Sequence, residues 1–203
     1  MFKLAVVICC LLLGISPLFA QEAAGAKKVV MIIAQNQFRD EELLQPKEIL
    51  EKAGVVVKVA SSSTSEAEGM LGAKVKPDFL ISEVNINDYD AIVFVGGSGA
   101  SEYWESPVAQ KLAKDANSAG KIVAAICLAP LTLANAGILE GKKVTAWETQ
   151  SQKLRDKGAF FTGRKVQKDG NLITASGPIA ANEFGQAILE ALSGKEKAQS
   201  NGY

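Results

Sequence analysis

The sequence contains no histidine. This absence excludes zinc sites built on imidazole ligands. It also excludes the Cys–His and Ser–His pairs from which many hydrolases obtain a base that titrates near neutral pH. Proton transfer in this protein must therefore use another kind of side chain.

Cysteine is also scarce, with three residues in the whole chain. Cys9 and Cys10 lie in an apolar stretch near the amino terminus, and Cys127 stands alone in the remainder. If that stretch is removed on export, no intramolecular disulfide can form. An exported protein with one unpaired thiol is unusual, because oxidising compartments favour disulfides. The pattern favours a functional role for Cys127, against the alternative of a small buried hydrophobic residue.

Neither sign of charge is in excess, since Lys plus Arg number 22 and Asp plus Glu number 22. Proteins that bind nucleic acid or an anionic membrane surface rely on an excess of basic side chains. We therefore expect no nucleic-acid partner. We likewise expect neither a metal ion nor a cofactor.

Residues 1–20 have the layout of a secretory signal peptide. Lys3 gives a short basic start, and Leu4 to Gly14 form an apolar core too short to span a bilayer comfortably. Cleavage is expected after Ala20. Leu18, at the third position before the cut, is larger than the small residue that is usual there. The protein would then be periplasmic or extracellular, with no membrane span left. A retained anchor is the alternative.

The rest of the chain is predicted to form one domain over residues 28–192, preceded by a linker at 21–27 and followed by a flexible tail at 193–203. This length can bury a full core. Continuous apolar runs of the kind found in strands buried on both faces alternate with helical patterns. They predict a doubly wound α/β sandwich with a mostly parallel sheet and helices on both faces. The expected strands are 28–34, 55–60, 89–95, 122–126 and 143–146; the helices are 40–53, capped by Asp40, then 107–119, 129–136, 150–157 and 179–192; hairpins are expected at 71–81 and 166–175.

Three candidate loops follow predicted parallel strands directly: residues 35–42, residues 96–99 and Cys127. Binding sites of doubly wound sheets lie beyond the carboxyl ends of the strands. If these strands are neighbours, the three loops open onto one crevice.

Cys127 stands between the strand that ends at Ile126 and the helix expected from Ala129, with no room for a loop. The chain must turn sharply there and lift the side chain out of the sheet, which is the geometry of a nucleophile elbow. The start of the following helix supplies backbone N–H groups that favour a thiolate. We therefore expect a pKa for Cys127 below the free value of about 8.5.

Four stretches resemble the ThiJ/PfpI superfamily in order and spacing. They are Phe38–Pro46, with Glu42 four residues before the proline; Asp90–Gly99, with the Gly96-Gly97 turn; Ala124–Pro130 continued by Ala136–Thr145; and Asp169–Pro178. The resemblance covers essentially the whole domain. It implies a flavodoxin-like sandwich, of the class I glutamine amidotransferase-like kind, that is usually a homodimer.

The same resemblance implies the roles of five residues. Cys127 is the nucleophile, and Glu42 is a protonated partner that donates a hydrogen bond to it. Gly96 and Gly97 form a turn whose N–H groups face the sulfur, and the N–H of Leu128 completes an oxyanion site. A buried neutral carboxylic acid can stabilise a thiolate in this way. The alternative is that Glu42 is a first-turn helix acid and that the two glycines form an ordinary turn.

The chain departs from the family pattern at Leu128, because members with peptidase-like or glyoxalase-like activity commonly carry histidine there or nearby. This departure disfavours a cysteine peptidase, which needs a base that titrates near neutral pH. We expect a stress-response protein whose partner is a small reactive carbonyl or an oxidant. Cys127 would either perform glyoxalase or deglycase chemistry, with Glu42 relaying the proton, or be oxidised as a redox sensor. A non-catalytic binding or scaffold domain is the alternative, and whether the protein is an enzyme stays open.

Three aromatic residues, Tyr103, Trp104 and Trp147, are expected at the pocket rim or at a dimer contact. Arg39 is expected to be a solvated surface charge that could also help to hold an anionic substrate.

Overall fold

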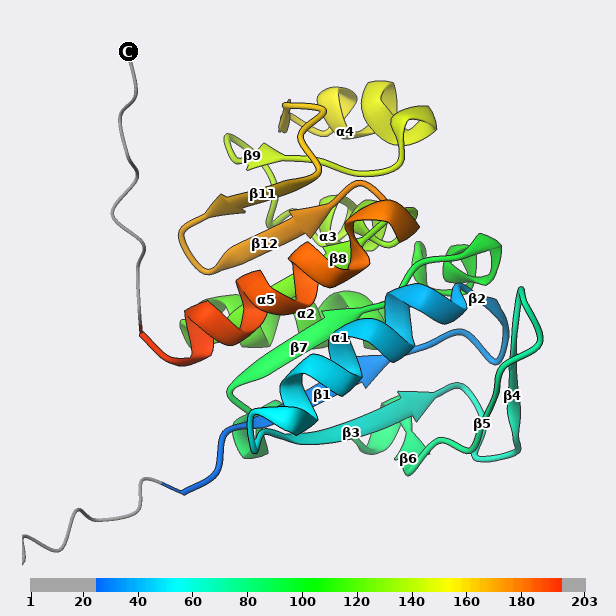
Figure 1. Ribbon diagram of the computed structural model, residues 1–203. Coiled ribbons are helices and arrows are strands. Elements are labelled where there is room, and N and C mark those ends of the chain that lie inside the picture. Colours follow the sequence, from blue (N-terminus) through cyan, green and yellow to red (C-terminus); the bar gives the residue numbers. More distant parts are fainter. Residues whose placement is uncertain (1–24, 195–203) are drawn as a thin grey trace, which may run out of the picture.

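The computed structural model describes residues 25–194. The predicted signal peptide, most of the linker and most of the tail lie outside these residues. At the centre is a seven-stranded sheet in the order β11-β12-β8-β7-β1-β3-β6 (Figure 1). All neighbouring strands are parallel except β11 and β12, which form the predicted hairpin. The strands are β1 (Lys28–Ile32), β3 (Val56–Ser61), β6 (Phe79–Leu80), β7 (Ala91–Phe94), β8 (Ile122–Ile126), β11 (Val166–Asp169) and β12 (Leu172–Ala175).

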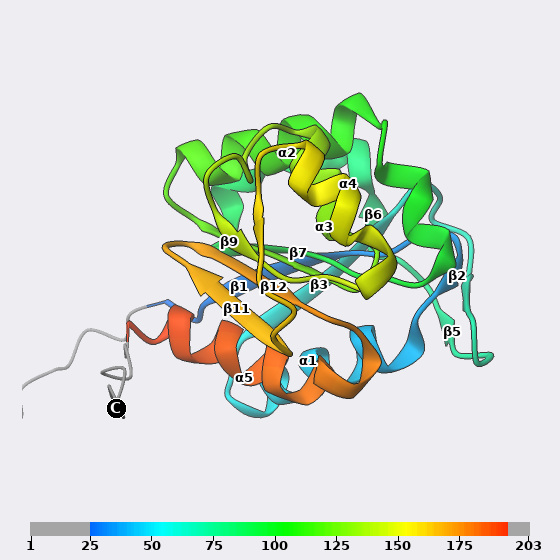
Figure 2. The same cartoon turned by 90° about the horizontal axis from the view of Figure 1, so that it is seen from above.

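Helices cover both faces of this sheet, which confirms the predicted flavodoxin-like sandwich. Figure 2 shows α1 and α5 on one side of the sheet and α2, α3 and α4 on the other. The helices are α1 (Asp40–Lys52), α2 (Pro107–Ser118), α3 (Pro130–Asn135), α4 (Ser151–Asp156) and α5 (Ala181–Leu192). Short 3-10 turns occur at Ile81–Glu83, Ile86–Asp88, Ser98–Tyr103, Glu148–Gln150 and Pro178–Ala180.

The buried part of the central strands is apolar because each face of the sheet has its own core. In β1, Val30 and Ile32 belong to the core under α2 and α3, whereas Val29 and Met31 belong to the core under α1 and α5. Successive side chains of a strand point to opposite faces. A strand covered by helices on both sides must therefore be apolar at every position, and the four residues are at most 1% exposed.

Two small sheets depart from the sequence expectations. A hairpin does follow β3, but β4 (Ala67–Gly69) and β5 (Lys74–Val75) form it together with β2 (Asn36–Phe38), and not residues 71–81. The expected strand at 143–146 is β9 (Lys143–Val144), which pairs with β10 (Phe160–Phe161) outside the main sheet. Strands of two or three residues carry too little periodicity to be recognised from the sequence.

Asp40 does not cap the first helix as expected. It is the first helical residue, Arg39 takes the cap position, and no side-chain hydrogen bond caps the helix. The Asp40 carboxylate instead accepts hydrogen bonds from the backbone N–H groups of Leu71 at 2.8 Å and Ala73 at 2.7 Å. The carboxylate therefore holds the β4–β5 hairpin against the start of α1.

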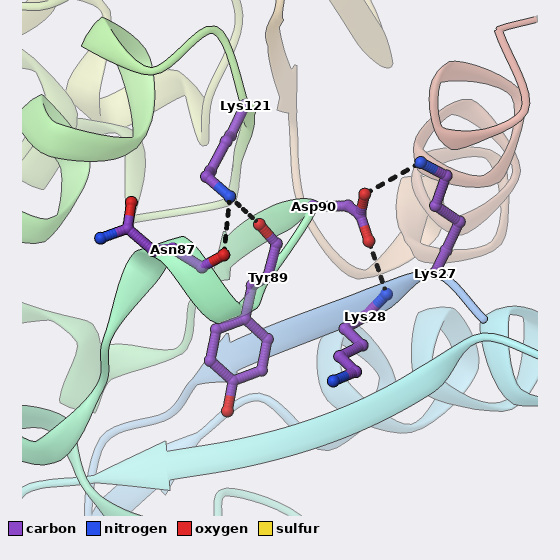
Figure 3. Close-up of polar contacts among 6 residues, drawn as sticks. All are labelled: Lys27, Lys28, Asn87, Tyr89, Asp90 and Lys121. Carbon is purple, nitrogen blue, oxygen red and sulfur yellow. Dashed lines mark hydrogen bonds and ion pairs between the residues drawn. The ribbon is translucent and has the colours of Figure 1, made fainter. Parts of the chain in front are cut away.

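Polar contacts join the amino ends of β1 and β7 (Figure 3). Cys127 lies at the opposite end of the sheet, because it follows the carboxyl end of β8, which runs parallel to β7. The Asp90 carboxylate accepts hydrogen bonds from Lys28 N at 2.8 Å and Lys27 Nζ at 2.9 Å. Burial raises the pKa of Asp90, but these two hydrogen bonds and the charges of Lys27 and Lys121 together outweigh burial, so the net shift is downward. Lys121 Nζ donates to the backbone oxygens of Asn87 and Tyr89 beside them. Within residues 25–194, no helix is both long and apolar enough to cross a membrane.

Candidate active site

The three loops singled out from the sequence meet at one end of the sheet. Their parent strands β8, β7 and β1 are direct neighbours in the sheet order. The loops that follow them therefore leave the sheet side by side, and the condition for a shared crevice is met. The backbone N–H of Arg39 donates to Gly96 O at 3.0 Å, which joins two of the loops directly.

Cys127 has the strained backbone of a nucleophile elbow. Its φ of 63° lies in the left-handed region, which few residues other than glycine adopt. Two neighbouring segments of the same chain fix this conformation, because Cys127 N donates to Ala175 O at 2.9 Å and Trp147 N donates to Cys127 O at 2.9 Å. The side chain is 7% exposed and lines a pocket. Its sulfur is therefore held at the end of β8, where it faces a cavity on one side and the core on the other.

The glycine turn is adjacent to Cys127, and both of its glycines are required by close contacts. A Cβ on Gly96 would lie 2.6 Å from Cys127 Cβ and 2.7 Å from Ile126 O. Gly97 has a φ of 98°, and a Cβ there would lie 2.4 Å from both Arg39 N and Gln37 O. Only glycine fits this turn, and the close approach lets the N–H of Gly97 reach the sulfur.

Glu42 lies at the inner side of the same site. It is on the first turn of α1, and its side chain is fully buried. Neither carboxyl oxygen has a hydrogen bond of good geometry with any residue of the described chain. The carboxyl nevertheless lies close enough to the Cys127 thiol and to the Gly96 N–H to interact with both. Glu42 is therefore not a solvated first-turn helix acid.

Burial dominates the titration of this pair. It raises the pKa of Glu42 to about 8, against the lowering effects of the Cys127 thiol and the Gly96 N–H. Burial and the Glu42 carboxylate together raise the pKa of Cys127 to about 12, against the lowering effects of the Gly97 and Leu128 N–H groups. At neutral pH each group therefore keeps its proton. The expectation of a protonated Glu42 agrees with this result, but the expectation of a Cys127 pKa below the free value is wrong.

The reason for the wrong pKa direction is that the helix start is only one contribution at the sulfur. Two N–H groups favour the thiolate, but the surrounding core withholds water from it, and desolvation is the larger effect. As the pH rises, Glu42 loses its proton before Cys127 does. The first anion to form is therefore a carboxylate beside a thiol, which is a base next to a nucleophile.

The pocket in front of Cys127 has a volume of about 340 Å³. Leu128 and Trp147 line it, so the residue that follows the elbow cysteine gives the pocket an apolar wall. Arg39 also lines the pocket, but its guanidinium forms two hydrogen bonds with the Glu41 carboxylate, at 2.8 Å and 3.0 Å. Trp147 is 46% exposed, as expected for the rim.

Tyr103 and Trp104 do not stand at the rim. Tyr103 is buried, and its hydroxyl donates to Ile33 O at 2.9 Å. Trp104 is partly buried, and its Nε1 donates to Leu128 O at 3.0 Å. Tyr103 therefore binds the backbone just after β1, and Trp104 binds the backbone of the residue that follows Cys127.

Sequence reasoning missed several pocket residues. Gln150 is 4% exposed, and its Oε1 has no hydrogen-bond partner among the residues that the structure describes. Met70 and Pro178 come from the small hairpin and from the turn before α5. No local sequence signal marks them, because the fold brings them to Cys127 from distant segments. No group of three or more acidic or cysteine side chains that could hold a metal ion occurs within residues 25–194.

Comparison with known proteins agrees with this geometry. The chain is 44% identical over 168 residues to an uncharacterized protein of Methanocaldococcus jannaschii, covering 81% of this chain and 82% of the relative. It is 30% identical over 177 residues to a glutathione-independent glyoxalase of Caenorhabditis elegans, covering 87% of this chain and 95% of the relative.

Solved structures give the same result. A ThiJ/PfpI domain protein from Brachyspira murdochii superimposes with a TM-score of 0.81 at 35% sequence identity, covering 84% of this chain and 99% of the other. The sequence model of the DJ-1/PfpI family matches residues 27–191, which include the elbow, the glycine turn and Glu42. The chain therefore belongs to the DJ-1/PfpI family.

Proposed function

We propose that this protein is a cofactor-independent enzyme of the glyoxalase type, which converts 2-oxoaldehydes to 2-hydroxy acids through Cys127 and Glu42. One observation carries the proposal: a fully buried carboxyl with a pKa of about 8 lies beside the only described thiol. A general base is most effective when its pKa lies near the working pH. Glu42 therefore supplies the property that an active-site histidine would otherwise provide. The similarity to a protein named as a glyoxalase supports the same reaction class.

The first step joins the sulfur to the substrate. The Glu42 carboxylate takes the proton of the Cys127 thiol while Sγ forms a bond to the aldehyde carbon. The negative charge moves to the aldehyde oxygen, which lies near the N–H groups of Gly97 and Leu128. Return of the proton from Glu42 to this oxygen gives a thiohemiacetal and restores the carboxylate.

The second step rearranges the substrate without an external oxidant. Glu42 removes the hydrogen of the former aldehyde carbon as a proton, and the resulting enediol is protonated at the neighbouring carbon. The first carbon is oxidised and the second is reduced, which gives a thioester of a 2-hydroxy acid. Water hydrolyses the thioester, releases the acid and restores the thiol.

The redox-sensor hypothesis is less well supported. Oxidation by peroxide proceeds through the thiolate, and burial raises the pKa of the Cys127 thiol to about 12. A thiol that keeps its proton reacts slowly with peroxide. Carbonyl addition leaves its charge on the aldehyde oxygen beside the N–H groups of Gly97 and Leu128, so Glu42 can accept the thiol proton during attack and return it to that oxygen.

The test is turnover of methylglyoxal to lactate by the wild type and by Cys127→Ser, Glu42→Gln and Glu48→Gln. Glu48 lies on the same helix, but its side chain is 62% exposed, so its variant is a matched control. We expect no lactate from Cys127→Ser, a decrease of about 10²- to 10⁴-fold for Glu42→Gln, and little change for Glu48→Gln. In D₂O, deuterium at carbon 2 of the lactate is expected if the hydrogen moves as an exchangeable proton.

Equal lactate formation by the wild type and Cys127→Ser would contradict the proposal. A parallel incubation with dilute peroxide, followed by intact mass, tests the sensor. A gain of two oxygens at Cys127, together with no turnover of methylglyoxal, would favour the redox-sensor hypothesis over the enzyme hypothesis. No reaction in either assay would favour the binding or scaffold domain.

We also propose that the protein is a homodimer. Large apolar side chains are exposed on elements near the pocket, namely Leu44, Met70, Leu71 and Ile179, which are 45%, 39%, 63% and 79% exposed. Burial of such side chains against a second copy would be favourable. Sedimentation equilibrium of the wild type and of Ile179→Lys tests this, and a monomeric wild type at micromolar concentration would contradict it.

Residues 1–20 are proposed to direct export to the periplasm or the exterior. The apolar core and candidate cleavage site after Ala20 support this proposal. Mass measurement of the protein recovered from the exported fraction tests it. An intact amino terminus on cell-associated protein would indicate a retained anchor instead.

A further inference from the structure

The walls of the Cys127 pocket are apolar on several sides. Met70, Leu128, Trp147 and Pro178 line it, and together they come from four separate segments of the chain. The volume of about 340 Å³ falls at the lower end of the usual range for pockets that enclose a small organic ligand, about 300–1,000 Å³. A substrate as small as methylglyoxal would leave most of this surface in contact with water.

The pocket offers little for a charged substrate. Arg39 is the only basic residue among those that line it in the described chain. Its guanidinium is held by Glu41 through two hydrogen bonds, so most of its charge is already neutralised. A substrate carboxylate would have to compete with Glu41 for this group. The chemistry of the walls therefore favours a neutral substrate.

One buried polar group in the wall lacks a partner. Gln150 is 4% exposed, and Oε1 of its side-chain amide accepts no hydrogen bond within residues 25–194. Buried polar groups in proteins are nearly always paired, and an unpaired group in a pocket wall calls for an explanation. Gln150 Oε1 is itself shielded from solvent, but the residue belongs to the pocket wall, so a rotation of its side-chain amide toward the cavity would pair it with a hydroxyl on the bound molecule. Both the hydrate of a 2-oxoaldehyde and the thiohemiacetal formed at Cys127 carry such a hydroxyl.

We propose that the pocket selects 2-oxoaldehydes with a bulky apolar body, such as an aryl or branched alkyl group, and that Gln150 binds the hydroxyl of the hydrate or of the thiohemiacetal. This inference rests on the proposed function, because it names the substrate class of the same site. Leu128 and Trp147 determine the preference for the apolar body. Gln150 is a positioning residue for the hydroxyl.

The first experiment compares kcat/KM for phenylglyoxal and methylglyoxal. Because the two aldehydes differ in intrinsic reactivity, the decisive quantity is how their ratio changes among variants. We expect the ratio to favour phenylglyoxal by at least about tenfold in the wild type and to fall about fivefold or more in Leu128→Ala and in Trp147→Ala. Phe160→Ala truncates an aromatic side chain that is 64% exposed and does not line this pocket, so its ratio should match the wild type.

The second experiment measures binding without turnover. Cys127→Ser is titrated calorimetrically with α-hydroxyacetophenone, acetophenone and hydroxyacetone. We expect α-hydroxyacetophenone to bind at least about fivefold more tightly than either of the others. Adding Gln150→Leu should abolish the advantage over acetophenone, which lacks the hydroxyl, but not the advantage over hydroxyacetone, which lacks the ring.

The two experiments separate the inference from the proposed function. If no 2-oxoaldehyde is turned over but the expected order of binding is observed, the proposed glyoxalase reaction is contradicted and the proposed class of ligand is supported. If turnover is confirmed but the ratio is the same in the wild type, Leu128→Ala and Trp147→Ala, the selectivity is overturned. Equal binding of acetophenone and α-hydroxyacetophenone to Cys127→Ser would overturn the role of Gln150.

Discussion

The Glu42 carboxyl lies against Gly96, so close that a Cβ built on this glycine would come within 2.3 Å of Oε2. The Glu42 side chain of α1 and the turn that follows β7 therefore leave no room for a further atom between them. This contact helps to exclude water from the carboxyl, which is completely buried. Burial in turn raises the pKa of Glu42 to about 8.

The stability of the protein should fall as the pH rises from about 5.5 to 7.5. Glu42 has an ordinary pKa of 4.5 and a folded-state pKa of about 8, so in this window the native state keeps a proton that the unfolded chain has lost. Raising the pH therefore favours unfolding, by up to roughly 1.4 kcal/mol per pH unit. Urea unfolding at several pH values measures the effect, and Glu42→Gln should remove it.

The absence of histidine makes this measurement unusually clear. No imidazole titrates in the same window in either state. Glu48→Gln, which changes an exposed carboxyl of the same helix, should keep the wild-type slope. A wild-type slope equal to that of Glu42→Gln would show that Glu42 is ionised in the native state at pH 5.5.

Alkylation of Cys127 by iodoacetamide should accelerate as the pH rises through about 8. Above this value Glu42 is a carboxylate that can take the thiol proton during attack, whereas below it both groups are protonated. Mass spectrometry of samples quenched at successive times gives the alkylation rate at each pH. The pH–rate profile of Glu42→Gln should lack the inflection near pH 8. A full rate at pH 6 would instead indicate a thiolate stabilised by the neutral acid, as the sequence suggested.

Gly97→Ala should destabilise the fold far more than Gly72→Ala does. The two glycines have nearly the same φ, 98° and 93°, but a Cβ on Gly97 would lie 2.4 Å from two backbone atoms, whereas a Cβ on Gly72 meets nothing within 4 Å. Gly72→Ala should therefore cost about 1–2 kcal/mol for its conformation alone. Gly97→Ala should cost at least about 3 kcal/mol. Similar losses in urea unfolding would mean that the turn has room to move.

Asp90→Asn should cost about 1–2 kcal/mol at pH 7, because the carboxylate accepts hydrogen bonds from Lys28 N and Lys27 Nζ. The net shift of the Asp90 pKa is downward from 3.8, so this stabilisation is present above that value and is lost as the pH falls below it. The difference between the variant and the wild type should therefore shrink in acid. Asp88→Asn, at an exposed position two residues earlier, is the control and should change stability by less than about 0.5 kcal/mol.

The sequence predicted the parts of the site that depend on the order of strands and helices. An apolar run that passes into a helical pattern at Cys127 leaves no residues for a loop, and the left-handed φ of 63° follows from this. The meeting of the three loops follows from the adjacency of β8, β7 and β1. Both predictions rest on chain connectivity, which a sequence pattern expresses directly.

Properties that depend on distant neighbours could not be predicted. The pKa of Cys127 depends on the surrounding core, and the sequence shows only the adjacent helix start. Asp40 has the sequence position of a helix cap, but its carboxylate binds the N–H groups of Leu71 and Ala73, which are 31 and 33 residues away in the sequence. Gln150 enters the pocket wall because the segment after β9 passes Cys127, where Trp147 N donates to Cys127 O, and this path has no local signature.

The left-handed backbone at Cys127 also has a practical consequence for engineering. Glycine adopts this conformation without the penalty of about 1–2 kcal/mol that other residues incur. Relief of this strain offsets the loss of the buried side chain and the extra freedom of glycine in the unfolded chain, so selection of variants for heat resistance alone would not remove Cys127→Gly, a protein that performs no thiol chemistry. Any library intended to make this protein more robust needs that codon held constant.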